Sequence, residues 1–291
     1  MGVELCPVEA MLDEIHPPIS RNLYSDVKQY GRGAYTLGRI GGHNIVVAAM
    51  PQIGNNAAAI VANQLWQDFP FVELRFLVGI GGGIPGGAED EDIRLGDVVR
   101  TGMSARPPAI LSANVERLKS LHHRERSRIP QFLEQMFERF PKMNEGYLRP
   151  NIGDDRLFKS NCLHQGGPTC QGCPTSQLIV RRQRTSSDPR IHYGIIGSGN
   201  TVVKDSYTRD CLKQDLNIIC VDMEASGLVD AFPSLVVRGI CDYADSHKNK
   251  NWQAYAAAVA AAYMKELLLI VPHEILVKRE GKQNAKHDME P

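Results

Sequence analysis

Two apolar runs that each end in acidic residues constrain the fold of this chain most. Residues 218–221 lead directly into Asp222 and Glu224, and residues 235–240 lead into Asp242. Both runs have the length and composition of buried strands. Ligands bind beyond the carboxyl ends of strands in open α/β sheets, whereas a hydrophobic core gains nothing from acids placed there. The pattern therefore predicts an α/β fold with a polar site at one end of its strands.

The rest of the chain fits one α/β domain, residues 1–275, with a central mixed sheet flanked by helices. Residues 142–187 show little periodicity and read as an irregular insertion, and residues 276–291 read as a disordered polar tail. The expected strands are residues 3–6, 35–40, 44–49, 74–80, 95–99, 191–196, 218–221 and 235–240. The expected helices are residues 9–15, 56–69, 109–120, 130–139, 204–214, 225–231 and 252–271.

Composition excludes several classes of partner. The chain has 291 residues, of which 43% are hydrophobic, and its 33 basic and 33 acidic residues give zero formal charge. We therefore expect no nucleic-acid partner and no membrane partner attracted by bulk charge. Residues 1–7 are too short and polar for a signal peptide, and Lys265 and Glu266 interrupt the longest apolar helix. Seven scattered cysteines are typical of reduced thiols in a cytoplasmic protein.

A glycine-dense segment, GGGIPG at residues 81–86, matches the G-x-G-x-x-G pattern. A dinucleotide site would also need a helix opening at the loop and an acid about 20 residues later, and neither is present. Two interpretations remain open. Gly81 and Gly82 either let the backbone approach a ligand closely or form a tight structural turn.

The two acids that follow the strands have structural alternatives. Asp242 is a candidate general acid, but an aspartate there could also cap a helix or pair with Arg238. The carboxylate of Glu224 could accept hydrogen bonds from a vicinal diol, or it could simply begin the helix expected at residue 225.

Four residues in the insertion have a partial metal-binding spacing. Cys162, His164, Cys170 and Cys173 form C-x-H-x5-C-x2-C, whose last part is a zinc-knuckle spacing and whose first part is atypical. Loop thiols beside an exposed histidine are the alternative. We expect no bound metal and no cofactor in this chain.

Several motifs in the same order resemble the nucleoside phosphorylase and nucleosidase superfamily. They read VGIGGGIP, DIRLGDVV, GIIGSGNTVVKD, VDMEASGL and VVRGICDYAD. Within the superfamily, the chain resembles methylthioadenosine/S-adenosylhomocysteine-type nucleosidases. It resembles most closely the fungal purine-nucleosidase-like domains of larger nucleotide-binding receptor-like proteins. The resemblance runs from about residue 3 to residue 272.

The resemblance implies a role for each matched residue. Asp242 would protonate purine N7, Glu224 would hold the ribose hydroxyls beside Met223, and Arg238 would lie behind the site and orient the acids. The segment CPVEAMLDE implies that Glu9 positions the attacking water. The resemblance also assigns base and ribose contacts to Gly81, Gly82, Ser198 and Gly199.

These roles imply a purine nucleoside N-ribosyl hydrolase that cleaves the N-glycosidic bond of adenosine-like nucleosides and works as a homodimer or larger homo-oligomer. Two alternatives stay open. A phosphorylase would need arginines around a phosphate, and Arg21, Arg32 and Arg75 do not form such a motif. A nucleoside-sensing module of weak activity would fit the shortened segments around Glu9 and residues 97–108.

Overall fold

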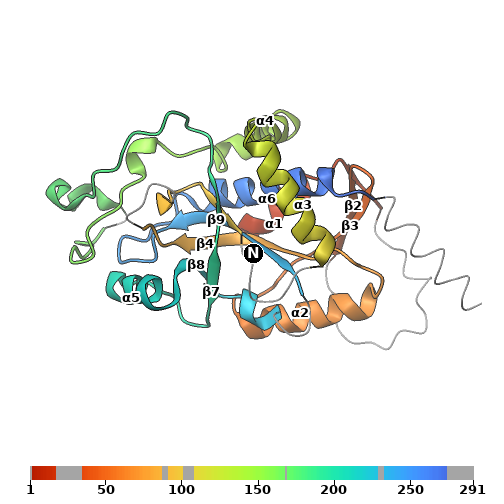
Figure 1. Ribbon diagram of the computed structural model, residues 1–291, viewed down its shortest axis with the longest axis horizontal. Coiled ribbons are helices and arrows are strands. Elements are labelled where there is room, and N and C mark those ends of the chain that lie inside the picture. The colour runs from red at the N-terminus through yellow and green to blue at the C-terminus, as the bar shows by residue number, and fades with distance from the viewer. Residues whose placement is uncertain are drawn as a thin grey trace, which may run out of the picture.

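The computed structural model describes residues 2–17, 35–86, 91–100, 108–167, 169–228 and 233–273. A six-stranded mixed sheet, in the order β6-β5-β9-β4-β8-β7, lies at its centre (Figure 1). Its strands are β4 (Phe76–Gly83), β5 (Val98–Arg100), β6 (Ile191–Tyr193), β7 (Ile195–Ser198), β8 (Ile218–Asp222) and β9 (Leu235–Asp242). The chain is an α/β protein with a mixed sheet, as the sequence predicts.

Helices cover both faces of this sheet (Figure 1). On one side α6 (Gln253–Ile270) packs on β4 and β9, and α2 (Asn55–Asp68) and α5 (Ser206–Leu216) lie on the other side. Two further helices, α3 (Ala109–His122) and α4 (Ile129–Arg139), pack against α6. A Cβ at Gly239 would lie 1.9 Å from the carbonyl oxygen of Ala256, so the alanine-rich α6 rests directly on β9.

A small second sheet joins β1 (Glu14–Ile15), β2 (Tyr35–Ile40) and β3 (His43–Ala48) in that order. Strands β2 and β3 are antiparallel, and Gly41 in the turn between them has a φ of 55°, which favours glycine. The strands expected at residues 35–40 and 44–49 therefore pair as an antiparallel hairpin.

The start of the chain differs from the prediction. Residues 3–6 belong to helix α1 (Gly2–Ala10), not to a strand, and the predicted helix over residues 9–15 is instead the end of α1 followed by β1. This helix packs against α6. The valine, leucine and cysteine of this segment suit a strand, but contact with a buried helix decides its conformation.

Two other elements are shorter than predicted. Gly194 divides the predicted strand at residues 191–196 into β6 and β7. The predicted helix at residues 225–231 is a 3-10 turn, η7 (Ala225–Leu228), and residues 229–232 lie outside the described residues. Among the described residues, no helix combines the length and apolar character needed to span a bilayer.

The described residues of the predicted insertion form short 3-10 turns and extended segments rather than α-helices or a sheet. The turns are η3 (Pro141–Glu145), η4 (Ile152–Asp154), η5 (Cys170–Gly172) and η6 (Thr175–Gln177). One isolated bridge joins Phe158 to Leu178. Residues 101–107 and 274–291, which hold most of the shortened segment and the predicted tail, lie outside the described residues, so the domain limits stay a prediction.

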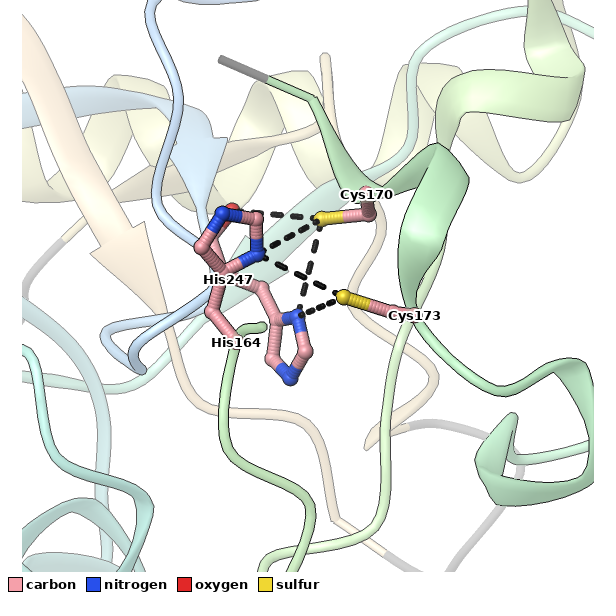
Figure 2. A group of neighbouring side chains, drawn as sticks. All are labelled: His164, Cys170, Cys173 and His247. Carbon is pink, nitrogen blue, oxygen red and sulfur yellow. Dashed lines mark hydrogen bonds between the residues drawn. The ribbon is translucent and has the colours of Figure 1, made fainter. Parts of the chain in front are cut away.

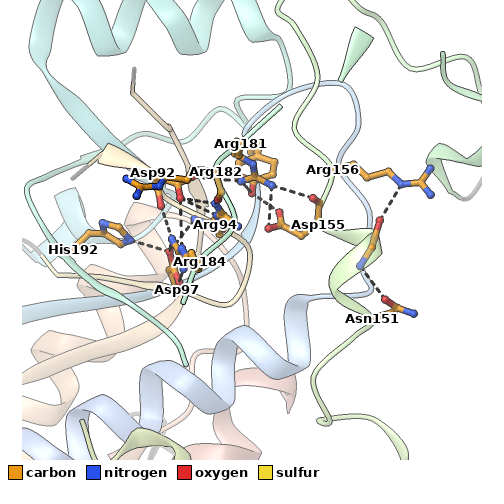
Figure 3. Close-up of polar contacts among 12 residues, drawn as sticks. Asp92, Arg94, Asp97, Asn151, Asp155, Arg156, Arg181, Arg182, Arg184 and His192 are labelled. Atoms are coloured by element: carbon orange, nitrogen blue, oxygen red, sulfur yellow. Dashed lines mark hydrogen bonds and ion pairs between the residues drawn. The ribbon is translucent and has the colours of Figure 1, made fainter. Parts of the chain in front are cut away.

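Ion pairs fasten the insertion to the rest of the domain (Figure 3). Arg184 donates to both carboxylate oxygens of Asp97 at 2.7 Å, and His192 lies 2.8 Å from the same carboxylate. Arg181 pairs with Asp155 at 3.0 Å and donates to the hydroxyl of Tyr243 at 2.7 Å. The contact of Arg181 with Tyr243 thereby holds the insertion against the residue that follows Asp242.

Candidate active site

The carboxyl ends of three neighbouring strands meet at one place in the sheet. Gly82 of β4 pairs with Asp242 of β9 on one side and with Val221 of β8 on the other. Strand β8 is antiparallel to β4, but the two pair only at their last residues, so their ends still converge. The two acidic strand ends that the sequence singles out therefore lie across one strand from each other.

Arg238 forms the centre of an acidic cluster. Its side chain is 1% exposed, and its guanidinium lies 2.6 Å from Asp222 and 3.2 Å from Glu224. Burial opposes the positive charge, but the two carboxylates outweigh it and raise the pKa of Arg238. The structure thus brings Arg238 and Glu224 together, and it places Asp222 as a second carboxylate partner of Arg238.

The surroundings of Glu224 disfavour the charged form of its carboxylate. Burial raises its pKa first, and the nearby charges of Asp222 and Glu4 raise it further, while Arg238 acts in the opposite direction. Its side chain keeps 12% exposure, so it can still meet a ligand. A half-buried carboxylate held in place by an arginine is suited to bind hydroxyl groups.

A different glutamate from the predicted one reaches this cluster. Helix α1 places Glu4 beside β4, where its carboxylate accepts a hydrogen bond of 3.0 Å from the backbone of Ile80. Glu9 lies further along the helix and accepts a hydrogen bond from Thr36 of the second sheet. The structure therefore does not bring Glu9 to the Arg238 cluster, and it does bring Glu4 there.

Asp242 is 4% exposed and is surrounded by three donors. The backbone of Ala244 donates at 3.0 Å, and the Cys241 thiol lies 3.2 Å away. Burial, together with the Asp242 charge, raises the pKa of that thiol well above its usual value, so it keeps the proton that it donates. Lys248 lies 2.9 Å from the second carboxylate oxygen.

Lys248 is a feature of the site that the sequence interpretation missed. Burial disfavours its charge, but Asp242 outweighs burial and raises the pKa of Lys248. Its side chain is 36% exposed, against 2% for Asp242, so it covers Asp242 from the solvent side. The lysine is thus an ion-pair partner of the candidate general acid.

The glycines of β4 make room for the site itself. A Cβ at Gly82 would lie 2.9 Å from an oxygen of Asp242, and one at Gly81 would lie 2.7 Å from the sulfur of Cys220. A Cβ at Gly79 would lie 2.4 Å from a guanidinium nitrogen of Arg238. Side chains at these glycines would collide with Asp242, Cys220 and Arg238. Glycine is therefore required here whether or not a ligand approaches the backbone.

The remaining predicted residues lie on the neighbouring edge. Ser198 ends β7, accepts a hydrogen bond of 3.0 Å from the backbone of Ser226, and lies 3.3 Å from the side-chain oxygen of Asn55. Gly199 donates to the backbone of Asp222 at 3.2 Å. Met223 stands between Asp222 and Glu224 and is half-buried. The hydroxyl of Ser198 is therefore engaged in tying β7 to the turn after β8.

A sequence signal could have revealed the role of Asp222 but not that of Glu4. Asp222 is the first acid after the apolar run, and a fully buried arginine on the following strand needs a carboxylate partner and further hydrogen-bond acceptors. Glu4 carries no such signal, because its position depends on the packing of α1. Arg75, considered for phosphate binding, instead lies 4.2 Å from the ring centre of Trp66.

Comparison with known proteins identifies the protein superfamily to which the chain belongs. The sequence profile of the phosphorylase superfamily matches residues 8–271, and the chain belongs to that superfamily. A nucleotide-binding leucine-rich repeat (NLR)-like protein of Hyaloscypha variabilis is 38% identical over 305 residues, which cover 94% of this chain and 29% of that protein. The chain therefore spans less than a third of the length of that relative.

Solved structures confirm the fold. A 5′-methylthioadenosine/S-adenosylhomocysteine nucleosidase from Neisseria meningitidis superposes with a TM-score of 0.53 at 17% identity, covering 92% of this chain and 95% of that one. Futalosine hydrolase of Helicobacter pylori gives a TM-score of 0.55 at 14% identity, covering 92% and 94%. The predicted resemblance to this superfamily and to its nucleosidase fold is thus confirmed.

Proposed function

We propose that this chain is a purine nucleoside N-ribosyl hydrolase acting on adenosine-like nucleosides. One observation carries the proposal, the gathering of four acids around the end of β4. Arg238 holds Glu224 and Asp222 at the end of β8. Glu4 and Asp242 both lie beside β4, where Glu4 contacts Ile80 and Asp242 pairs with Gly82. Acids with separate partners at adjoining strand ends can perform separate tasks.

The proposed reaction divides the work among three carboxyl groups. Asp242, once protonated, gives its proton to purine N7, so that the C1′–N9 bond breaks with its electron pair going to a neutral base. Glu224 holds the ribose hydroxyls. Water attacks C1′, and Glu4 takes the proton that this water loses. The products are the free base and free ribose.

Glu4 takes the role that the sequence assigns to Glu9, because Glu4 acts electrostatically on both Glu224 and Arg238. A water base must lie near the sugar, and the sugar is held by Glu224 in this scheme. Five further residues would border the base and the ribose: Gly81, Gly82, Ser198, Gly199 and Met223.

A second candidate function is nucleoside sensing with weak turnover. Lys248 at 2.9 Å from Asp242 favours it, since an ion-paired acid is not ready to protonate a base. The 38% identical relative, an NLR-like protein more than three times as long as the matched segment, is also consistent with a sensing role. A homo-oligomeric state and a cytoplasmic location stay predictions.

Product analysis separates the candidates. Purified protein is incubated with adenosine, inosine, guanosine and 5′-methylthioadenosine, with and without phosphate, and the products are separated by chromatography. The hydrolase predicts free base and free ribose, or 5-methylthioribose from 5′-methylthioadenosine, at a rate that does not depend on phosphate. Ribose 1-phosphate formed only with phosphate would replace it with a phosphorylase.

The Asp242→Asn variant is the matched control, because asparagine keeps the size of the side chain and cannot act as the acid. Its turnover should fall by about 100-fold or more. Saturable nucleoside binding in calorimetry without turnover of any substrate would establish the sensing module instead.

A further inference from the structure

Four potential metal ligands from distant parts of the chain point toward one another (Figure 2). They are His164, Cys170 and Cys173 of the insertion and His247 of the loop after β9. One ligand atom from each lies within 4.8 Å of the others. His247 stands 74 residues beyond Cys173, so the sequence spacing of the insertion alone does not reveal the set.

The distances have the values of a tetrahedral zinc site. Cys170 Sγ lies 3.8 Å from His164 Nδ1 and 3.5 Å from His247 Nδ1. Cys173 Sγ lies 3.5 Å and 3.7 Å from the same two atoms. Zinc bonds of about 2.3 Å to sulfur and about 2.0–2.1 Å to nitrogen, at tetrahedral angles, separate S and N by about 3.5–3.6 Å.

Both histidines have the tautomer that metal binding requires. His164 Nε2 lies 3.0 Å from the carbonyl oxygen of Gly167, and His247 Nε2 lies 3.0 Å from that of Cys162. A carbonyl only accepts, so each Nε2 carries the proton. Each Nδ1 then directs its lone pair toward the two thiols, the arrangement in which outer hydrogen bonds orient metal-bound histidines.

The structure assigns a structural Zn²⁺ site to His164, Cys170, Cys173 and His247. Two thiolates and two neutral imidazoles form a Cys₂His₂ set that favours zinc over hard cations. Binding releases one proton from each thiol, and the two thiolates balance the charge of the ion. Four protein ligands leave no open position for substrate or water, so the site is structural.

Cys162 does not belong to the set, although its spacing suggests it. Its sulfur lies against the carbonyl of Leu163, at 4.0 Å, and its own carbonyl orients His247. Its side chain belongs to a small buried cluster with Phe158 and Cys173. Phe158 also stacks on His247, with ring centres 3.9 Å apart, which fixes the ring of that ligand.

The site would join the insertion to the loop that carries the proposed acid. The backbone of His164 donates to Ser246 at 3.0 Å, immediately before His247. A cavity of about 270 Å³ is lined by Cys170 and Gln171 of the insertion and by Asp242, Tyr243 and His247. Loss of zinc should therefore loosen one wall of the cavity at Asp242 as well as the insertion.

Metal analysis of the purified full chain tests the proposal. We expect about one zinc per chain after gel filtration in a buffer without added metal, and less than about one tenth of that in Cys170→Ser and in His247→Ala. Cys162→Ala is the matched control, since it removes a buried thiol a few residues away, and it should keep its zinc. Loss of zinc in Cys162→Ala with retention in His247→Ala would overturn the ligand assignment.

Cobalt substitution keeps the test decisive if a variant fails to fold. Protein that is stripped of metal and reduced should bind one Co²⁺ and show the strong visible absorption of tetrahedral cobalt with a thiolate charge-transfer band. Hydrogen exchange in residues 157–178 and 243–248 should slow when zinc is restored. A Cys170–Cys173 disulfide in the mass of unreduced protein, together with no zinc and no cobalt spectrum after reduction, would refute the site.

Discussion

The Arg238 cluster and the His164–His247 cluster are built in opposite ways. The first draws three of its members from residues 222–238, on or just after strands β8 and β9, which lie on either side of β4 in the sheet. The second joins residues 164–173 to His247 across a loop contact. The first rests on a hydrogen-bonded sheet, whereas the second needs some further interaction to hold an irregular segment in place.

The difference shows how the two regions keep their geometry. Strand pairing fixes the spacing of Asp222, Glu224 and Arg238 before any ligand is bound. The insertion has few backbone bonds of its own, so it relies on discrete attachments: Arg184 with Asp97, Arg181 with Tyr243, and the proposed zinc. We expect changes in the sheet cluster to affect catalysis and changes in the attachments to affect stability.

The largest expected effect compares two glutamates of α1. Glu4→Gln should lower nucleoside hydrolysis by about 100-fold to 10,000-fold, because it removes the base that takes the proton from water. Glu9→Gln keeps an oxygen that can accept the hydrogen bond from Thr36 and changes no group of the proposed reaction, so the rate should stay within about threefold of the parent. Steady-state rates of the two purified variants decide between them.

The opposite result, with activity lost in Glu9→Gln and kept in Glu4→Gln, would restore the role that the sequence assigns to Glu9. Comparable circular dichroism spectra are the control for folding, because both substitutions keep the shape of the side chain.

Arg184→Ala should cause the largest loss of stability in the insertion. Asp97 is 1% exposed, and removal of its guanidinium partner leaves a buried carboxylate short of compensation. The free energy of unfolding should fall by about 3–5 kcal/mol. The exposed Arg124 is the matched control, and Arg124→Ala should change the unfolding free energy by less than about 0.5 kcal/mol. Equal effects in urea unfolding would show that the pair does not anchor the insertion.

These two regions also explain how far the sequence could predict the structure. Periodicity and apolar runs identify β4, β8, β9 and α6, because these elements are buried and locally consistent. The motif residues Glu224, Arg238 and Asp242 follow from strand ends. The structure brings Glu224 and Asp242 to the ends of β8 and β9, on either side of β4, and Arg238 contacts Glu224 from within β9.

The features that the sequence did not predict all depend on contacts between distant segments. The N-terminal segment has strand-like residues, but its packing on α6 makes it a helix and carries Glu4 rather than Glu9 to the site. His247 is one histidine among nine in the chain, and only the folded loop brings it to Cys170 and Cys173.

Sugar selectivity should reveal a smaller effect at Glu224. A 2′-deoxynucleoside leaves part of this half-buried carboxylate without a partner, which costs about 1–3 kcal/mol. We expect kcat/KM for 2′-deoxyadenosine to be lower than that for adenosine by the corresponding factor, and we expect Glu224→Gln to reduce this discrimination. If the parent handles both sugars equally, Glu224 does not bind the 2′-hydroxyl.

The smallest expected effect is the acid sensitivity of the insertion's attachment through Asp97. Burial alone would raise the pKa of Asp97, but hydrogen bonds from Arg184 and His192 outweigh it and lower the pKa to about 2. A depressed pKa in the folded state means that the stabilisation is complete above the unfolded value of about 3.9 and is lost as the pH falls through about 2. Urea unfolding between pH 5 and pH 2 should therefore show a loss of about 1–2 kcal/mol that Asp97→Asn, already less stable at pH 5, does not show. A parallel decline of the parent and of Asp97→Asn would mean that other carboxylates govern the acid limit and that this attachment is not the acid-sensitive one.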